Sequence, residues 1–196
     1  MSPLVLASGS PQRRAILATL GVEHRVVVPD VDERTDGDPI EVAVHNALLK
    51  ARAVAAAEPA GTLVLGSDTV IVDRTGDRPV AVGKPADAPA AAAMLHRWSG
   101  HGHHVASAAA VVRAGAPGED TTTLFSGADT TLVRFRTLAD DDVDWYVRTG
   151  EWQGRAGGYA IQLRGTLLVD GIDGDWWTVV GLPVALLARE LPALWR

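Results

Sequence analysis

The segment at residues 4–21 most constrains the fold, because it combines the signals of a strand, a tight turn and a helix in one stretch. Residues 4–7 form a short apolar run of the kind that a buried strand shows. Ser10 is a favourable N-cap, and Pro11 falls at the first helical position, where its missing N–H costs nothing. Gly21 supplies a C-terminal stop. The stretch therefore predicts a strand, a turn and a helix in direct succession.

The turn in this segment has the properties of an anion site. A helix N-terminus presents unpaired N–H groups and a partial positive charge, which favours a negatively charged ligand. Ser8 and Ser10 add hydroxyl donors around the turn, and Arg13 and Arg14 add guanidinium groups. A phosphate group is the natural ligand of such a turn. The alternative is an ordinary capped helix with two solvated arginines.

Composition limits the class of protein and its partners. With 196 residues and 47% hydrophobic content, the chain can bury a packed core as one large domain or two small lobes, and we expect a single domain over residues 1–196. The absence of cysteine excludes disulfides, thiolate catalysis and cysteine-ligated zinc. A net charge of −6 argues against a broad nucleic-acid interface, so no nucleic-acid partner is expected. An acidic protein that handles phosphates needs a local basic site, a divalent cation or both.

The hydropathy pattern gives no sign of a membrane segment. No uncharged stretch approaches the roughly 20 apolar residues that a membrane helix needs. The N-terminal residues also lack a basic stretch followed by a long apolar run. We therefore expect no membrane partner and a location in the cytoplasm.

Alternating strand and helix patterns predict an α/β fold. Apolar and alanine residues at helical spacing predict helices over residues 41–57 and 88–98. The strand-rich stretch at residues 105–136 argues against a regular all-parallel sheet. Within it, residues 121–136 suggest an edge strand or a long hairpin arm. Residues 176–180 are expected to form a further strand. The pattern predicts a mixed, twisted sheet flanked by helices, with two lobes around a cleft.

Asp68 is the sharpest single candidate for chemistry. Residues 66–69, Gly-Ser-Asp-Thr, interrupt an apolar strand, so Asp68 is expected in a turn at a strand end, where open α/β sheets build their ligand sites. Its candidate roles are metal ligand and general base, and the alternative is an aspartate that caps its own turn. Glu33 lies in an acidic loop whose charges mostly face solvent. A second carboxylate beside Asp68 would complete an oxygen-rich site for Mg²⁺ or Mn²⁺.

Two lysines stand out because the chain otherwise uses arginine. Lys50 lies within the helix predicted over residues 41–57, where a surface charge is the commoner outcome for a lysine. Lys84 lies between Gly83 and Pro85, which restrict the backbone on either side and direct its side chain from a strand end. Both are candidates for neutralising phosphate charge.

Three further groups of residues have both a functional and an ordinary interpretation. The glycine pair before Gln162 and its amide suit recognition of a nucleobase edge, but the same segment can be a turn that enters a strand. The histidines at 101, 103 and 104 suggest zinc, which is the less favoured alternative because no further histidine or cysteine lies at ligand spacing. Trp176 and Trp177 suit a core or dimer surface better than a base-stacking platform.

Taken together, these residues resemble the Maf proteins, nucleoside triphosphate pyrophosphatases related in fold to inosine triphosphate pyrophosphatase. The resemblance spans nearly the whole chain, and its specificity lies in the order and spacing of motifs that are individually weak. These motifs are Leu6-Ala-Ser-Gly-Ser-Pro-Gln-Arg-Arg14, Val31-Asp-Glu33, Ala47-Leu-Leu-Lys-Ala51, Gly66-Ser-Asp-Thr-Val70, Gly83-Lys-Pro85, Ser99-Gly100 with His103 and Val105, Gly150-Glu151, Ala156-Gly-Gly-Tyr-Ala-Ile-Gln162 and Val180-Gly-Leu-Pro183.

The resemblance implies hydrolysis of a nucleoside triphosphate between the α- and β-phosphates, which releases a monophosphate and pyrophosphate. It also implies a divalent cation, Mg²⁺, Mn²⁺ or similar, and a homodimer. Asp68 falls on the family's proton-acceptor position. The residues on positions that line the same phosphate and metal site are Ser8, Arg13, Glu33, Lys50 and Lys84.

The resemblance also bears on the base. One branch of the family favours dTTP and UTP and another favours 7-methyl-GTP, and the branches differ at the positions of Gln12, Thr69 and Gln162. Thr69 and Gln162 are similar to the dTTP/UTP branch, whereas Gln12 stands where that branch usually has arginine. The expected substrates are dTTP and UTP, as part of sanitising the nucleotide pool. The alternatives are 7-methyl-GTP hydrolysis or a non-catalytic nucleotide-binding regulator of cell division.

Overall fold

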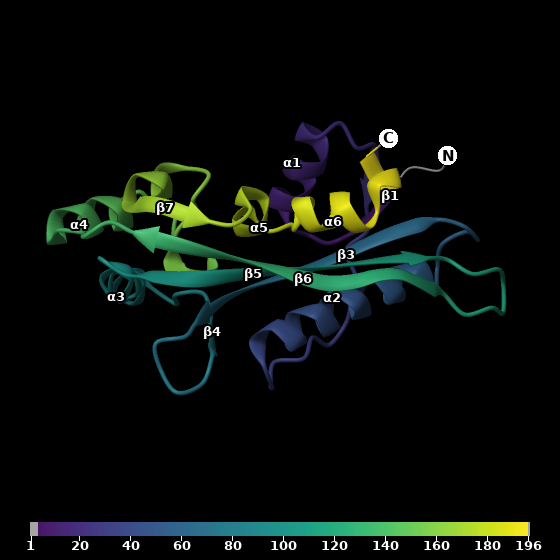
Figure 1. Cartoon of the computed structure of the whole chain (residues 1–196), viewed down its shortest axis with the longest axis horizontal. Coiled ribbons are helices and arrows are strands. Elements are labelled where there is room, and N and C mark those ends of the chain that lie inside the picture. The colour runs from purple at the N-terminus through teal and green to yellow at the C-terminus, as the bar shows by residue number, and fades with distance from the viewer. Residues whose placement is uncertain (1–3, 196) are drawn as a thin grey trace. The chain divides into compact units, whose positions relative to one another are not determined.

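The structure is a computed structural model that describes residues 4–195, and it confirms the mixed α/β class (Figure 1). Seven strands form one sheet in the order β2-β1-β3-β5-β6-β7, with β4 also paired to β3. The chain forms two compact units. Unit 1 comprises Met1–Thr69, Ser107–Asp129 and Gly181–Arg196, and unit 2 comprises Val70–Ala106 and Thr130–Val180. A single domain over the whole chain and a cleft stay predictions.

Unit 1 contains the predicted strand, turn and helix, which are β1 (Leu4–Ala7) and α1 (Pro11–Thr19). All four residues of β1 are buried. This strand pairs in parallel with β2 (His24–Val26) on one side and with β3 (Leu63–Asp73) on the other. Parallel pairing on both sides explains the uninterrupted apolar run, because such strands are buried on both faces.

The helix α2 (Pro39–Ala55) packs directly against β3, and Gly66 makes this close contact possible. A side-chain carbon at Gly66 would lie 2.2 Å from the carbonyl oxygen of Ala47 and 2.8 Å from the amide nitrogen of Ala51. No residue other than glycine fits this position without moving the helix. The contact fixes the middle of α2, and with it Lys50, over this part of β3.

The expectation of a turn at residues 66–69 is wrong, because β3 is one continuous strand and Asp68 lies in its middle. A buried strand tolerates an aspartate only where the charge finds a partner. Lys50 on α2 supplies that partner, and Gly66 brings the helix close enough for the lysine to reach it. The polar interruption in the sequence is therefore part of a regular strand, in which Asp68 is paired with Lys50.

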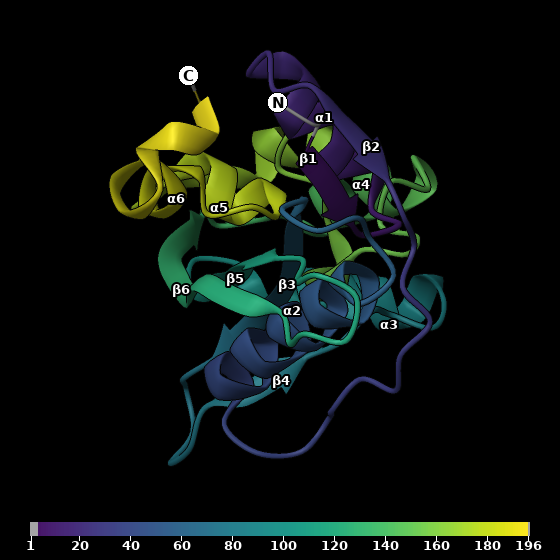
Figure 2. The same ribbon diagram turned by 90° about the vertical axis from the view of Figure 1, so that its right-hand side faces the viewer.

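Unit 1 is completed by parts of two long strands and by the C-terminal helices. The strands are β5 (Gly102–Arg113) and β6 (Thr122–Phe135), and the helices are α6 (Val184–Glu190) and a short 3₁₀ helix, η3 (Pro192–Trp195). Within unit 1, Figures 1 and 2 show α2 on one side of the strands and α1 and α6 on the other. Among residues 4–195, no helix combines the length and the apolar character needed to cross a bilayer.

Unit 2 adds two further strands and most of the short helices. Strand β6 has a neighbour on each side, β5 and β7, so it is not the edge strand that is one of the two expectations for residues 121–136. The other elements of unit 2 are β4 (Val80–Val82), α3 (Ala88–Trp98), α4 (Asp140–Arg148), η1 (Ala156–Gly158), η2 (Arg164–Leu168), β7 (Val169–Asp173) and α5 (Trp176–Val180).

Two of the sequence predictions for unit 2 have opposite outcomes. The helix predicted over residues 88–98 is α3 and is confirmed. The strand predicted over residues 176–180 is wrong, because these residues form α5. The Asp175 carboxylate accepts hydrogen bonds from the N–H groups of Trp177 at 3.3 Å and Thr178 at 3.1 Å, which is the pattern that starts a helix.

Candidate active site

The residues predicted for the site in unit 1 collect on the two faces of β3. Successive side chains of a strand point to opposite faces. Asp68 points, like Gly66, toward α2, where it meets Lys50. Ser67 and Thr69 point to the opposite face, where both bond to the carbonyl oxygen of Gly181. One strand thus contributes to two different groups of polar side chains.

The first group is the carboxylate–lysine cluster, formed by Glu33, Lys50 and Asp68. The Lys50 Nζ atom lies 2.7 Å from Glu33 Oε2 and 2.9 Å from Asp68 Oδ1. Lys50 is only 7% exposed, so the expectation of a surface charge does not hold for it. The side chains of Glu33 and Asp68 keep 45% and 21% of their surface exposed. The cluster is therefore anchored from inside by the lysine and open to a ligand through its carboxylates.

Glu33 lies in the loop before α2, and Asn46 holds this loop in place. The Arg34 N–H donates to Asn46 Oδ1 at 2.9 Å, and Asn46 Nδ2 donates to the Arg34 carbonyl at 2.9 Å. Asn46 is itself buried on α2, one turn before Lys50. The two hydrogen bonds fix the backbone next to Glu33 relative to the helix that carries Lys50.

The cluster has the donor set for a divalent cation that arrives with a nucleotide. Two carboxylate oxygens lie within 3 Å of one ammonium nitrogen, so a cation can take the place of the ammonium. Among residues 4–195, no group of three or more His, Cys, Asp or Glu side chains is placed to hold a metal. Mg²⁺ is commonly bound by one or two carboxylates plus substrate phosphates and water. Glu33 and Asp68 fit that pattern, provided that Lys50 moves away.

The second group is the Arg13 network, formed by Ser8, Arg13, Ser67, Thr69, Ser107 and Gly181. The guanidinium donates from Nε to the Gly181 carbonyl at 2.9 Å, from Nη1 to Ser8 Oγ at 3.0 Å and from Nη2 to Thr69 Oγ1 at 3.0 Å. Burial lowers the pKa of Arg13, while the nearby charges of Asp68 and Glu33 act in the opposite direction. Arginine remains protonated in proteins, so the network surrounds a fixed positive charge.

Three members of this network, Ser67, Ser107 and Gly181, are not candidate site residues from the sequence alone. Thr69 Oγ1 lies 2.9 Å from Ser107 Oγ and 3.2 Å from the Gly181 carbonyl oxygen, and Ser67 Oγ donates to the same oxygen at 3.3 Å. Gly181 has a φ of 130°, which is the region that favours glycine. Its motif, residues 180–183, is visible in the sequence, but its carbonyl becomes a candidate only once the fold brings it to β3.

The turn between β1 and α1 is arranged around Ser8. Its Oγ atom accepts from the Ser10 N–H at 3.2 Å as well as from Arg13. A hydroxyl accepts two hydrogen bonds and donates one, so Ser8 can still donate to an anion. Ser10 Oγ does not cap α1 but donates to Gln12 Oε1 at 3.0 Å. Gln12 thus lies against the turn at the start of the helix.

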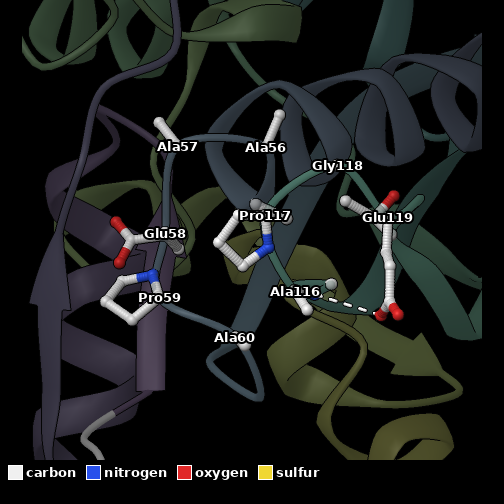
Figure 3. A pocket seen from close by; sticks show the side chains of 12 residues that line it. Ala56, Ala57, Glu58, Pro59, Ala60, Ala116, Pro117, Gly118 and Glu119 are labelled. Carbon is white, nitrogen blue, oxygen red and sulfur yellow. Dashed lines mark hydrogen bonds between the residues drawn. The ribbon is translucent and has the colours of Figure 1, made fainter.

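A separate hollow of about 280 Å³ in unit 1 contains none of the predicted site residues (Figure 3). It is lined by residues 55–60 at the end of α2 and by the loop between β5 and β6. Its two carboxylates are already engaged, because Glu58 pairs with Arg25 and Glu119 accepts from the Ala116 N–H at 3.4 Å. This hollow offers no group that points to a ligand.

Comparison with known proteins adds the family. A family model described as Maf-like protein matches residues 3–194. This chain belongs to the Maf-like family. It is 42% identical over 186 residues to the dTTP/UTP pyrophosphatase of Symbiobacterium thermophilum, covering 94% of this chain and 90% of that one. It is 44% identical over 194 residues to the dTTP/UTP pyrophosphatase of Moorella thermoacetica, covering 97% and 94%.

Two solved structures of Ham1 proteins are also similar to this Maf-like chain, at a level too low to carry an argument. The protein from Staphylococcus aureus has a TM-score of 0.42 and 18% identity over 71% of this chain and 73% of that one. The protein from Coxiella burnetii has a TM-score of 0.47 and 15% identity over 98% of this chain and all of that one.

The remaining predicted residues of this Maf-like protein lie in unit 2. Lys84 follows β4 and is exposed, and Gln162 is also exposed. The Gly157 N–H donates to the Gly83 carbonyl at 3.1 Å, so the Lys84 segment runs next to the glycine pair that precedes Gln162. Unit 2 therefore brings these two segments together, as unit 1 does for its own candidates.

Of the three neighbouring histidines, His103 belongs to the core of unit 2, whereas His101 is exposed. His103 is 1% exposed, and its ring centroid lies 4.7 Å from that of Trp98, 5.8 Å from Phe135 and 5.5 Å from Tyr159. Neither ring nitrogen has a hydrogen-bond partner, and burial lowers the pKa of His103 to about 4. The less favoured zinc alternative finds no support, since the described residues contain no suitable ligand group.

Proposed function

We propose that this chain hydrolyses nucleoside triphosphates, with dTTP and UTP preferred, to the monophosphate and pyrophosphate. The observation that carries the proposal is the Lys50 ammonium held between two carboxylates in a Maf-like chain. The Lys50 ammonium of this cluster can bind phosphate oxygens of a triphosphate. The carboxylates of Glu33 and Asp68 can bind a metal ion, and one of them can accept a proton. The printed names of the relatives, dTTP/UTP pyrophosphatase at 37–44% identity, support the same reaction.

Phosphate binding is assigned to the basic and hydroxyl groups of the site. The buried Arg13 guanidinium keeps two N–H groups beyond those donated to Ser8, Thr69 and Gly181. Ser8 donates its hydroxyl hydrogen to a phosphate oxygen beside it. Lys50 neutralises further phosphate charge, and the resemblance to the Maf proteins implies a phosphate-binding role for Lys84. Preorganised charges of this kind stabilise the transition state because they need no rearrangement during the reaction.

Lys50 has to change partners when the substrate binds. A triphosphate offers oxygens that compete with Glu33 and Asp68 for the ammonium, and Lys50 Nζ then turns toward them. Glu33 and Asp68 are left to hold Mg²⁺, Mn²⁺ or a similar cation, which neutralises phosphate charge when bound.

Asp68 acts as the proton acceptor in the chemical step. A water oxygen forms a bond to the α-phosphorus, and the bond from that phosphorus to the α,β-bridging oxygen breaks. The electron pair of the broken bond stays on the bridging oxygen, which leaves as part of pyrophosphate, and the water proton goes to Asp68. A carboxylate has two oxygens, so one can remain a ligand while the other accepts this proton.

The reaction type is tested by its products. The protein is incubated with dTTP and UTP in the presence of Mg²⁺ or Mn²⁺, and pyrophosphate and orthophosphate are measured separately. We expect one pyrophosphate for each monophosphate. Orthophosphate as the first product would contradict the assigned bond. Tight nucleotide binding with no product after long incubation would support the alternative of a non-catalytic regulator.

The base preference is tested by comparing substrates. Gln12, Thr69 and Gln162 are proposed to influence base choice, and the Gln12 side chain lies against the turn of α1. We expect kcat/KM to be higher for dTTP and UTP than for CTP, GTP and 7-methyl-GTP. Gln12→Arg restores a planar, charged fork and should sharpen the pyrimidine preference. A native preference for 7-methyl-GTP would contradict the branch while leaving the reaction type intact.

The protein is further proposed to act as a homodimer in the cytoplasm. The dimer rests on the resemblance to the Maf proteins, and light scattering on the purified protein tests it. The location rests on the hydropathy pattern of the sequence, and fractionation of cells that express the protein tests it.

A further inference from the structure

Gln162 lies on a tight turn within unit 2. The Leu163 N–H donates to the Ala160 carbonyl at 3.1 Å, so the chain reverses within a single turn that carries Gln162. Ile161 is 3% exposed and anchors the turn in the core, whereas Gln162 is exposed. Gly165 lies against the same turn, because a side-chain carbon there would be 2.5 Å from the Ala160 carbonyl oxygen. The turn is therefore compact, and the contacts on its two flanks determine how it is held.

Two side chains at the C-terminal end of α4 and just beyond it hold the two flanks of this turn. The Ala160 N–H donates to Tyr146 Oη at 3.0 Å, and Tyr146 is fully buried. The Arg164 N–H donates to Glu151 Oε2 at 2.9 Å, and the Glu151 side chain is only 16% exposed. One backbone N–H before Gln162 and one after it are thus each bound by a side chain from the same part of the fold.

Thr149 connects the two residues that hold the turn. Its hydroxyl donates to the Tyr146 carbonyl at 2.6 Å and accepts from the Glu151 N–H at 3.2 Å. The Glu151 carboxylate also lies 3.7 Å from Arg164 Nε, but the Arg164 side chain is 61% exposed, and exposed ion pairs contribute little. The main role of this carboxylate is therefore to accept from the Arg164 N–H, which the amide oxygen of a glutamine can also do.

We propose that Glu151 and Tyr146 are positioning residues that hold the Gln162 turn in the conformation that discriminates between nucleobases. This inference rests on the proposed function, since it concerns the base preference assigned to Gln162. An exposed glutamine on an unsupported turn must be ordered when a ligand binds, and this ordering lowers the affinity. Hydrogen bonds on both flanks order the turn in advance. Loss of either acceptor should therefore reduce the discrimination between bases more than it reduces turnover in general.

The kinetic test compares Glu151→Ala, Glu151→Gln and Tyr146→Phe on dTTP and GTP. In Glu151→Ala and Tyr146→Phe we expect kcat/KM to fall about tenfold for dTTP and less than about twofold for GTP. Glu151→Gln should keep the dTTP-to-GTP ratio within about twofold of native, because its amide oxygen still accepts from the Arg164 N–H. An unchanged ratio in Glu151→Ala and Tyr146→Phe would overturn the inference, and so would an equal change of the ratio in Glu151→Gln.

Asp87→Ala is the matched control for general destabilisation of unit 2. The Asp87 carboxylate also accepts one backbone N–H, that of Ala90 at 2.8 Å, but it does so at the start of α3. This variant should cost a similar amount of stability in denaturant titrations and leave the dTTP-to-GTP ratio unchanged. An equal change of the ratio in Asp87→Ala would overturn the inference, because loss of stability alone would then explain the effect.

A double-mutant cycle tests whether Glu151 acts through Gln162. Gln162→Ala removes the amide that the turn presents. In this background Glu151→Ala should change the dTTP-to-GTP ratio by less than about twofold, because there is no amide left to position. Changes of the ratio that multiply in the double variant would show independent roles and overturn the inference.

A readout without nucleotide keeps this inference separate from the proposed function. Amide hydrogen exchange, followed by NMR, should be at least about tenfold faster for the Arg164 N–H in Glu151→Ala and for the Ala160 N–H in Tyr146→Phe. Unchanged exchange would overturn the inference even if turnover is found. If the native protein binds triphosphates without hydrolysing them, the proposed function fails. The dissociation constants of dTTP and GTP then replace kcat/KM in the same comparison, with the same expected ratios.

Discussion

The buried charges of unit 1 and the buried His103 of unit 2 are held in different ways. In unit 1, the buried Arg13 guanidinium donates hydrogen bonds to three neighbouring residues. The buried Lys50 ammonium is paired with two carboxylates. In unit 2, His103 is buried among aromatic rings, and both of its ring nitrogens lack a partner. A partnered buried charge is held in one geometry, whereas an unpartnered imidazole stays neutral and packs as a ring. We therefore expect substitutions in unit 1 to change activity and substitutions at His103 to change stability.

Asp68→Asn should give the largest effect and the clearest separation of activity from stability. It keeps the shape of the side chain but removes the proton acceptor, so kcat should fall by about 10²–10⁴. The melting temperature should change little, because Asp68 remains partly exposed. Pyrophosphate release and thermal unfolding measure the two outcomes, and Asp144→Asn on exposed α4 is the control. Near-native turnover would refute the proton-acceptor role.

Gly181→Ala should disturb the Arg13 network through the backbone. The added carbon itself has room, since its nearest neighbour would be Thr69 Oγ1 at 3.6 Å. The φ of 130° is unfavourable for alanine, so the carbonyl that Arg13 and Thr69 share must shift. We expect kcat/KM to fall about 10- to 100-fold and stability to fall by about 1–3 kcal/mol.

Gly118→Ala is the matched control for this strain. Gly118 has a φ of 86° and open space around it, in the loop between β5 and β6. Its substitution should cost similar stability in denaturant titrations but leave kcat/KM unchanged. Equal activity losses in the two variants would show that strain alone accounts for the effect of Gly181→Ala.

Lys50→Met should raise the affinity for a metal while lowering turnover. Without the ammonium, Glu33 and Asp68 are no longer neutralised, and Mn²⁺ gains two ligands without a competitor. We expect Mn²⁺ to bind about tenfold more tightly in the absence of nucleotide, measured by electron paramagnetic resonance. The double variant Lys50→Met with Glu33→Gln should lose this gain. Equal Mn²⁺ affinity in native protein and Lys50→Met would contradict a metal site at these carboxylates.

His103 should give the smallest effect, confined to the pH dependence of stability. Burial lowers its pKa to about 4 from an ordinary value of 6.5, so between these values the unfolded chain binds the proton more readily than the folded protein. The free energy of unfolding should therefore fall as the pH drops through this window, by at most about 1.4 kcal/mol per pH unit, and be unaffected by His103 above it.

His103→Phe tests this assignment. The variant should show a shallower loss of stability between pH 6.5 and pH 4 than the native protein, and its kcat at pH 8 should be close to native. His101→Phe, at an exposed position, serves as the control. A large loss of turnover in His103→Phe at pH 8 would contradict the expectation that His103 affects stability and not activity.

The sequence was sufficient for those parts of the fold and site that depend on local patterns. Capping residues and apolar spacing predicted β1, α1 and α3, because these signals act within a few residues of each other. Asp68 and Lys50 were chosen as unusual residues in their local surroundings. The structure brings the Lys50 Nζ atom to 2.9 Å from Asp68 Oδ1, a distance that no local sequence pattern predicts.

The parts that could not be predicted depend on contacts between distant segments. Asp68 was placed in a turn because the partner that stabilises it within a strand lies 18 residues earlier, on α2. Residues 176–180 are rich in β-prone side chains, but the Asp175 carboxylate caps the N-terminus of a helix at these residues. Ser107 and Gly181 carry no chemical signal in sequence, since a serine hydroxyl and a carbonyl become functional only where the fold places them.

The pairing of β1 with β3 has a consequence for how this site tolerates insertions and deletions. Ala7 lies opposite Gly66, and this register decides which β3 side chains face α2 and which face Arg13. A slip by one residue would turn every side chain of the strand to the other face. Thr69 would then meet Lys50, and Asp68 would be set against the buried guanidinium. A deletion of Ser67 would thus replace the Lys50–Asp68 ion pair, which a nucleotide can displace, by a buried ion pair between Arg13 and Asp68. The Asp68 carboxylate would then occupy the place proposed for a nucleotide phosphate.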